Sequence, residues 1–130
     1  MKKILLATEK PFAPVAVEGI REIFSKAGYA LVLLEKYPSK DVFIAAVVGV
    51  DGLIVRSDQV DADVVAAAQK LKVIVRAGAG YDNIDLKACS ARNIVVMNTP
   101  GQNANAVAEL VMGIMVYLAR NGFNGTSGID

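Results

Sequence analysis

The sequence predicts an α/β fold in which a parallel sheet is covered by helices on both faces. Short apolar runs of strand length alternate five times with segments whose apolar residues recur at helical spacing. The runs are apolar at almost every position, which is typical of strands that are buried on both sides. A chain of 130 residues that is 54% hydrophobic has the size of one domain and can bury a core without disulfides or metal.

The first two strand–helix units lie in residues 3–48. Residues 3–8 are rich in Ile and Leu and predict the first strand. Residues 14–27 have apolar side chains three and four apart, and Gly28 behind them suits a helix C-terminus. Residues 29–34 predict the second strand. A weaker helical pattern follows over residues 39–48.

The third unit and the fourth strand occupy the middle of the chain. Residues 52–55 form a wholly apolar run and predict the third strand. Asp61 is a favourable N-cap for a helix that we expect to continue through residue 71. Residues 73–75 then predict the fourth strand, which leads into a glycine-containing turn.

The last two helices and the fifth strand complete the pattern. We expect a helix over residues 83–92, and Asn93 suits the left-handed residue that ends it. Residues 94–97 predict the fifth strand, and a long helix follows over residues 105–120. The remainder, residues 121–130, is rich in Gly, Asn, Ser and Thr and predicts a linker.

The order of these elements restricts the sheet topology. Crossovers between parallel strands are right-handed, which leaves few arrangements of five strand–helix units. We predict a three-layer, flavodoxin-like fold with strand order 2-1-3-4-5, not the order typical of dinucleotide-binding domains. The globular domain should cover residues 1–120, with residues 121–130 as its tail.

Composition excludes several functional classes. The formal net charge is +1 and no apolar run approaches the roughly 20 residues of a membrane span, so neither a nucleic acid nor a membrane partner is expected. The apolar run near the N-terminus is too short for a signal peptide, and the lone Cys89 cannot form an internal disulfide, which favours the cytoplasm. Histidine is absent, so the commonest general base and metal ligand are missing, and no metal site is predicted.

Cationic residues follow three of the predicted strands. Lys10 follows the first strand, Arg56 and Ser57 follow the third, and Arg76 follows the fourth. Ligands of open α/β sheets bind outside the carboxyl ends of the strands, so these residues predict a site for a small anion. The alternative, equally open on these residues alone, is that the arginines pair on the surface with Glu9, Asp58 and Asp82.

The turn formed by residues 78–80 resembles part of a dinucleotide fingerprint. However, Asn83 occupies the third glycine position, and no acidic residue follows at the spacing that a ribose requires. We therefore reject a dinucleotide site here, and no cofactor-binding residue is predicted. The glycines either let backbone N–H groups approach an anion or simply form a tight turn.

Three runs of this sequence resemble a known family. Residues 73–85 read VIVRAGAGYDNID and residues 96–103 read VMNTPGQN, with VAEL at residues 107–110. Both are similar to signature segments of D-3-phosphoglycerate dehydrogenases, which are D-isomer-specific 2-hydroxyacid dehydrogenases. Residues 53–57, LIVRS, match a third segment, so the resemblance spans nearly the whole chain in the right order.

This resemblance implies roles for particular residues. Arg56 and Ser57 would contact the substrate, Arg56 through a phosphate or carboxylate group, and Arg76 would add positive charge to the same pocket. Asn103 would form a hydrogen bond with the substrate near the nicotinamide. The backbone N–H groups that would hold the substrate carboxylate are those of Ala77, Gly78, Ala79 and Gly80.

The resemblance also implies that substrate binding and NAD binding belong to different domains. In the family a second domain binds NAD and carries a catalytic arginine and a glutamate–histidine pair, and this sequence contains no counterpart of it. The chain would thus be the substrate-binding domain of an enzyme that oxidises 3-phosphoglycerate to 3-phosphohydroxypyruvate in serine synthesis. We expect no catalytic residue, no bound cofactor and no activity in the chain alone. A related 2-hydroxyacid dehydrogenase and a stand-alone module that binds a small anion or dimerises remain alternatives.

The predicted last helix is apolar on almost every face. A sheet can cover only one side of it, so an uncovered apolar face predicts a homodimer through the helix over residues 105–120. The alternative is that other helices or the tail cover this face. The apolar residues concerned are Val107, Leu110, Val111, Met112, Ile114, Met115, Val116, Tyr117 and Leu118.

Overall fold

A computed structural model describes residues 2–9, 12–78, 80–99 and 104–121. Within them, five parallel strands form one sheet in the order β2-β1-β3-β4-β5. The predicted α/β class and strand order are therefore confirmed. The strands are β1 (Lys3–Thr8), β2 (Ala30–Glu35), β3 (Gly52–Val55), β4 (Val73–Ala77) and β5 (Val95–Thr99). The helices are α1 (Pro14–Lys26), α2 (Lys40–Val47), α3 (Ala62–Ala67), α4 (Leu86–Ala91) and α5 (Ala104–Asn121).

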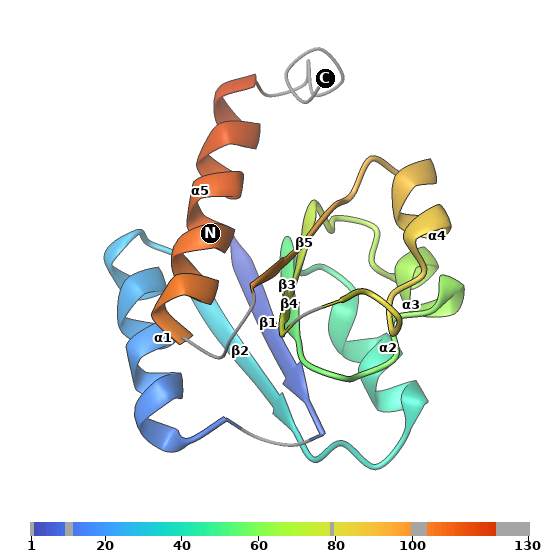
Figure 1. The fold of residues 1–130 in the computed structure, drawn as a ribbon, viewed down its shortest axis with the longest axis horizontal. Helices are drawn as coiled ribbons and strands as arrows, with labels where there is room; N and C mark the ends of the chain where they lie inside the picture. The colour runs from blue at the N-terminus through green and yellow to red at the C-terminus, as the bar shows by residue number, and fades with distance from the viewer. Residues whose placement is uncertain (1, 10–11, 79, 100–103, 122–130) are drawn as a thin grey trace.

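The helices form two layers with the sheet between them. In Figure 1, α1 and α5 lie on one face of the sheet, whereas α2, α3 and α4 lie on the other. The last turns of α5 extend beyond the strands, so the sheet does not cover that end of the helix (Figure 1). The predicted three-layer arrangement is confirmed, and it leaves part of one helix without a covering layer.

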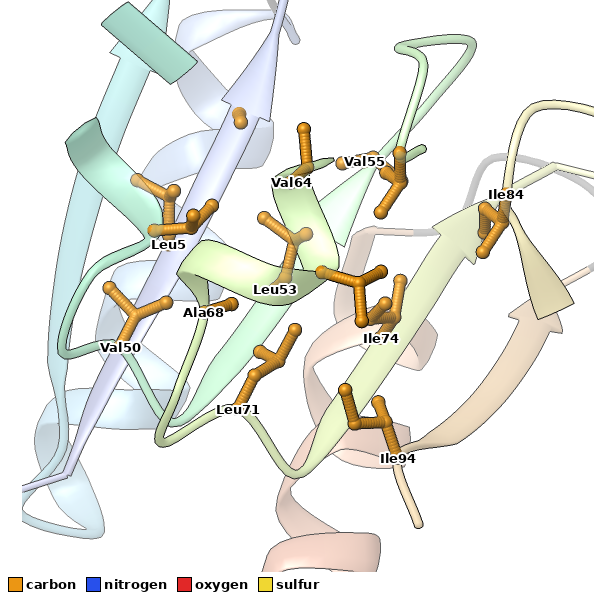
Figure 2. Packing of buried hydrophobic residues seen from close by; sticks show 14 of the residues in the cluster. Leu5, Val50, Leu53, Val55, Val64, Ala68, Leu71, Ile74, Ile84 and Ile94 are labelled. Carbon is orange, nitrogen blue, oxygen red and sulfur yellow. The ribbon is translucent and has the colours of Figure 1, made fainter. Parts of the chain in front are cut away.

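Alternating side chains of the central strands fill both interfaces. On one face, Leu5, Leu53 and Ile74 pack against Phe43 and Val64, and Figure 2 shows much of this cluster from close by. These five side chains are almost completely buried. Burying a side chain of this size is worth about 1.5–3 kcal/mol, so this interface contributes strongly to stability.

The other interface lies under α1 and α5. Here Ile4, Ile54 and Val75 pack against Phe24 from α1 and Val111 from α5. Every residue of β3, and all but the first of β1, is buried, whereas β2 and β5 at the edges are mostly half-buried. Burial on both faces, which the apolar runs predict, is therefore confirmed for the central strands. The edge strands β2 and β5 are less buried than predicted.

Helix α4 begins later than the sequence pattern indicates. The expected start was residue 83, but α4 begins at Leu86, with the Asp85 carboxylate accepting a hydrogen bond from the Ala88 N–H at 3.0 Å. Residues 82 and 83 form a turn, Ile84 forms an isolated parallel bridge with Val60, and Asp85 is extended, so the helix starts only after them. The Val60 N–H donates to the Asn83 carbonyl, and the Asp85 N–H donates to the Val60 carbonyl, both at 2.8 Å.

Helix α3 ends earlier than expected, at Ala67 instead of residue 71. Its start agrees with the prediction, because the Asp61 carboxylate accepts a hydrogen bond from the Val64 N–H at 3.1 Å. At its end, the Arg92 guanidinium donates to the carbonyl oxygens of Val65, Ala68 and Gln69. A distant side chain thus satisfies carbonyls that a longer helix would have bonded internally.

The C-terminal boundaries differ slightly from those expected. Strands β4 and β5 each continue two residues further, because the pairs Arg76–Asn98 and Ala77–Thr99 extend the ladder. Helix α5 includes Asn121, and the rest of the predicted tail, residues 122–130, lies outside the described residues. None of the described helices is long and apolar enough to cross a membrane.

Candidate functional site

The candidate site lies at the edge of the sheet where the parallel strands end, which we term the carboxyl edge. The described segments after β1, β3 and β4 meet there, which brings Arg56, Arg76 and the turn at Gly78 together, with Ser57 next to Arg56 in the chain. Of the residues that the sequence predicted here, Lys10, Ala79 and Asn103 lie outside the described residues. Their roles stay predictions.

Arg56 is held through its main chain and through its side chain. Its carbonyl oxygen accepts hydrogen bonds from Arg76 Nε at 3.0 Å and from Asn83 Nδ2 at 3.1 Å. The guanidinium carbon lies 5.0 Å from the centre of the Phe12 ring, a distance typical of a cation–π contact. The residue is half-buried, so a guanidinium in this position can present charge to a ligand at the carboxyl edge.

Arg76 turns its guanidinium toward main-chain carbonyls. Besides the bond to Arg56, Nη1 lies 3.5 Å from the carbonyl oxygen of Gly80, at the limit of a hydrogen bond. The side chain therefore ties the loop after β3 to the loop after β4. Its predicted contribution to the charge of a substrate pocket stays a prediction, and the structure adds this organising role.

The glycine turn after β4 has a backbone that other residues rarely adopt. Gly78 has φ +145°, and a Cβ atom there would lie 3.2 Å from Arg76 Nη1. Its N–H donates to the carbonyl oxygen of Thr99 at 3.0 Å, so this donor is already used in the sheet. Of the predicted anion-binding N–H groups that the structure describes, Ala77 belongs to β4 and Gly78 already donates, which leaves that of the exposed Gly80 as the better candidate.

Asp58 joins three segments at the carboxyl edge and was not predicted to do so. It is 5% exposed, and its carboxylate accepts hydrogen bonds from the Glu9 N–H at 2.9 Å and the Tyr37 hydroxyl at 2.5 Å. The Arg56 N–H lies 3.4 Å from its other oxygen. Burial, and then the bond to Asp58, raise the pKa of Tyr37 well above its usual range, so its hydroxyl remains a donor.

Asn83 is a second residue that the sequence did not identify. Its Nδ2 donates to the Arg56 carbonyl and, at 2.7 Å, to the Asp58 carbonyl, so one amide group holds both ends of the Arg56–Asp58 segment. Its Oδ1 is buried without a hydrogen-bond partner. The only sequence signal is its position in the glycine-containing run, where it stands at the third glycine position of a dinucleotide fingerprint.

Ser57 is exposed and lines a neighbouring pocket of about 500 Å³ with Glu9, Tyr37 and Lys40. Lys40 forms ion pairs with Asp61 at 2.5 Å and with Asp63 at 3.1 Å. The hydrogen bond from Lys40 lowers the pKa of Asp61, which keeps this N-cap carboxylate ionised. Ser57 and Arg56 therefore lie beside each other in the chain but in different surroundings.

Two other kinds of chemistry can be assessed. Cys89 is 1% exposed, and burial raises the pKa of its thiol to about 11, so it is a packed side chain and not a nucleophile. Among the described residues, no group of three or more His, Cys, Asp or Glu side chains could hold a metal ion. The predicted recognition of an anion at the carboxyl edge stays a prediction.

Comparison with known proteins identifies the family. The model of the family described as "D-isomer specific 2-hydroxyacid dehydrogenase, catalytic domain" matches residues 6–125. The chain belongs to the D-isomer-specific 2-hydroxyacid dehydrogenase family. The resemblance carried by residues 53–57, 73–85 and 96–110 is thereby confirmed.

Relatives within the 2-hydroxyacid dehydrogenase family share substantial identity with this chain. Human D-3-phosphoglycerate dehydrogenase is 46% identical over 101 residues, which cover 77% of this chain and 19% of the human protein. The enzyme of the same name from Mycobacterium tuberculosis strain H37Rv is 44% identical over 84 residues, 64% of this chain and 16% of that protein. The chain thus spans about a fifth of the length of its curated relatives.

A solved structure of a family member supports the same relationship. The NAD⁺-bound crystal structure of 3-phosphoglycerate dehydrogenase from Entamoeba histolytica is 56% identical to this chain, with a TM-score of 0.76. The match covers 94% of this chain and 40% of that one. Both the sequence and the fold of this 2-hydroxyacid dehydrogenase domain are therefore shared with phosphoglycerate dehydrogenases.

Proposed function

We propose that this chain is the substrate-binding part of an NAD-dependent 3-phosphoglycerate dehydrogenase, which oxidises 3-phosphoglycerate to 3-phosphohydroxypyruvate on the route to serine. The observation that carries the proposal is the ordered Arg56 at the carboxyl edge, with its carbonyl bonded to Arg76 and Asn83. The 56% identity to the Entamoeba histolytica phosphoglycerate dehydrogenase supports this substrate over other 2-hydroxyacids.

The residues of the carboxyl edge have distinct tasks in this proposal. Arg56 binds the phosphate or carboxylate of the substrate with two parallel N–H groups, which a planar guanidinium does better than an ammonium. The exposed Ser57 hydroxyl and the N–H groups of Ala79 and Gly80 add neutral donors. Asn103 bonds the substrate near the position where hydride leaves. No residue of this chain moves the proton.

The described residues do not fit a dinucleotide. The Gly78 N–H, which a phosphate-binding turn would need, donates to Thr99, and the third glycine position is Asn83, whose amide holds two carbonyls. In this proposal NAD accepts the hydride and is bound by a part of the full-length protein outside this chain. The 130-residue chain alone is then inactive.

Substrate preference tests the proposal directly. The full-length protein should reduce NAD with 3-phosphoglycerate more efficiently than with D-lactate, D-glycerate or other unphosphorylated 2-hydroxyacids, because an arginine binds a dianionic phosphate strongly. The measurement is kcat/KM for each acid by NADH absorbance, with the 130-residue chain as the inactive control. Preference for an unphosphorylated acid would contradict the substrate assignment, and NADH production by the chain alone would contradict the division of labour.

We further propose that α5 mediates a homodimer. Val116 and Tyr117 are 43% and 45% exposed, and a shallow apolar pocket beside them is lined by Val95, Leu110 and Ile114 among others. An exposed apolar surface of this kind favours association of two copies about a twofold axis. Met115, which the sequence pattern grouped with the uncovered residues, is only 3% exposed and packs toward the sheet instead.

Sedimentation equilibrium at micromolar concentration tests this dimer. The chain should sediment at about twice its 13.7 kDa mass, and Tyr117→Lys should shift it to the monomer because a charge would enter the apolar contact. Glu18→Lys on the exposed surface of α1 is the matched control and should leave the dimer intact. A monomeric parent chain would overturn the proposal.

A further inference from the structure

The main chain of Arg56 is fixed from several directions. Its carbonyl oxygen accepts from Arg76 Nε at 3.0 Å and Asn83 Nδ2 at 3.1 Å, and its N–H points to the Asp58 carboxylate at 3.4 Å. Arg76 lies near the end of β4 and Asn83 lies beyond it. Their hydrogen bonds therefore attach the loop after β3 to the neighbouring strand β4. The freedom that remains to Arg56 is therefore mainly in its side-chain torsions.

Phe12 restricts that remaining freedom. Its ring belongs to the buried cluster under α1 and α5, beside Val17 and Leu33, and the residue is only 9% exposed. A ring embedded in a core is a rigid surface, and the guanidinium carbon of Arg56 lies 5.0 Å from its centre. A guanidinium held over the face of a ring by a cation–π contact has one side covered, and its N–H groups stay available to an anion on the other sides.

We propose that Phe12 is a positioning residue for substrate recognition, acting through the guanidinium of Arg56. This inference rests on the proposed function, because it assumes that Arg56 binds the substrate anion. Phe12 itself makes no contact with the substrate. It holds the guanidinium in one orientation before the substrate arrives, so less side-chain freedom is lost on binding.

The expected effect is on binding and not on turnover. In the full-length protein, Phe12→Leu should raise KM for 3-phosphoglycerate by about 3- to 30-fold, the range expected from loss of a cation–π contact, with kcat nearly unchanged. Phe12→Tyr retains a ring and should restore KM to within about twofold of the parent value. If the role of Phe12 were purely structural, Phe12→Leu would lower the stability of the protein. It would not produce this difference in KM between the Leu and Tyr variants.

A second phenylalanine supplies the matched control. Phe24 belongs to the same cluster and is fully buried, and its ring stacks with that of Tyr29, with the ring centres 6.4 Å apart. Phe24→Leu should lower the thermal midpoint and leave KM unchanged. If Phe12→Leu behaves like Phe24→Leu, with an unchanged KM while Arg56→Ala still raises it, the positioning role of Phe12 is overturned and the proposed function survives. If Arg56→Ala also leaves KM unchanged, both fail.

A spectroscopic measurement tests the contact without activity. In the ¹H–¹⁵N spectrum of the 130-residue chain, the ring current of Phe12 should displace the Arg56 Nε–H resonance, which is assigned by its loss in Arg56→Lys. Phe12→Leu should move this resonance toward the position of an unstacked arginine, and Phe12→Tyr should leave it nearly in place. A resonance that Phe12→Leu does not move would overturn the proposal.

Discussion

Arg56→Ala should reduce kcat/KM for 3-phosphoglycerate in the full-length protein by a factor that corresponds to about 2–4 kcal/mol of recognition. The charged hydrogen bonds of a guanidinium would be lost, and the substrate anion would remain partly desolvated without its partner. The Arg56 main chain is held by Asn83 and Arg76, so the truncation should leave the loop in place. Steady-state kinetics followed by NADH absorbance would measure the loss of substrate recognition. Unfolding curves of the parent protein and the variant would show separately whether the fold is unchanged.

Three companion variants make the result specific. Arg56→Lys keeps the charge but loses the planar pair of donors, so it should fall between the parent and Arg56→Ala. Arg76→Ala should cost less recognition, because Arg76 uses its Nε on a main-chain carbonyl. Arg21→Ala removes an arginine that pairs with Glu18 on α1 and should have no effect. If the Arg56 and Arg76 variants change kcat/KM as little as Arg21→Ala does, Arg56 is an ordinary surface arginine and does not bind the substrate.

The parallel sheet was predictable because its signal is local. The runs at residues 3–8, 52–55 and 73–75 are apolar at nearly every position, and only strands buried on both faces require that. Chain order and crossover handedness then left few strand orders, and the one that we predicted among them, 2-1-3-4-5, is the one observed. The predicted ends of helices were wrong where tertiary contacts determine them. Residues 83–85 are not helical because Ile84 pairs with Val60, which lies more than twenty positions earlier, and a turn at residues 82 and 83 precedes this bridge.

The candidate site was predictable only in part. Arg56, Ser57 and Arg76 could be located because they follow strands of one parallel sheet, whose ends must meet. Asp58 and Asn83 could not be assigned, because their roles depend on how the loops after β1, β2 and β4 approach one another. Nothing in the sequence indicates that Tyr37 donates to Asp58, or that the Asn83 amide donates to the carbonyl oxygens of both Arg56 and Asp58.

Helix α5 shows another limit of periodicity. When a helix is apolar around most of its circumference, spacing alone does not say which residues face the sheet. The structure places Val107, Val111 and Met115 inward and leaves Val116 and Tyr117 partly exposed. The inward set recurs every four residues, as one face of a helix should, but the outward residues are equally apolar in sequence.

Asn83→Asp should lower the free energy of unfolding of the 130-residue chain by about 3 kcal/mol or more at pH 7. The amide Nδ2 donates to the Arg56 and Asp58 carbonyl oxygens, and the residue is only 8% exposed. The substitution barely changes shape, but it replaces a donor by an ionised acceptor that faces two other acceptors in a buried position. Chemical denaturation monitored by circular dichroism gives the difference.

The loss should depend on pH in a definite direction. In the folded variant the introduced carboxyl has its pKa raised above the usual value of about 4, because burial and the two carbonyls both disfavour its charge. Below that usual value the carboxyl is protonated in both states and can donate one hydrogen bond, so the loss is smallest. The loss then grows as pH rises from the unfolded pKa to the folded one. Unfolding curves should therefore show a larger deficit at pH 7 than at pH 4.5.

Asn98→Asp is the control that isolates the geometry. It introduces the same charge at the same carboxyl edge, but Asn98 Oδ1 accepts a hydrogen bond from the Tyr81 hydroxyl at 2.8 Å, and a carboxylate can accept that bond equally well. Its cost should stay within about 1 kcal/mol. Equal losses for the two variants would mean that charge alone is responsible. A stable Asn83→Asp chain would mean that the Arg56–Asp58 segment does not depend on this amide, and that Asp58 and Arg76 suffice to hold it.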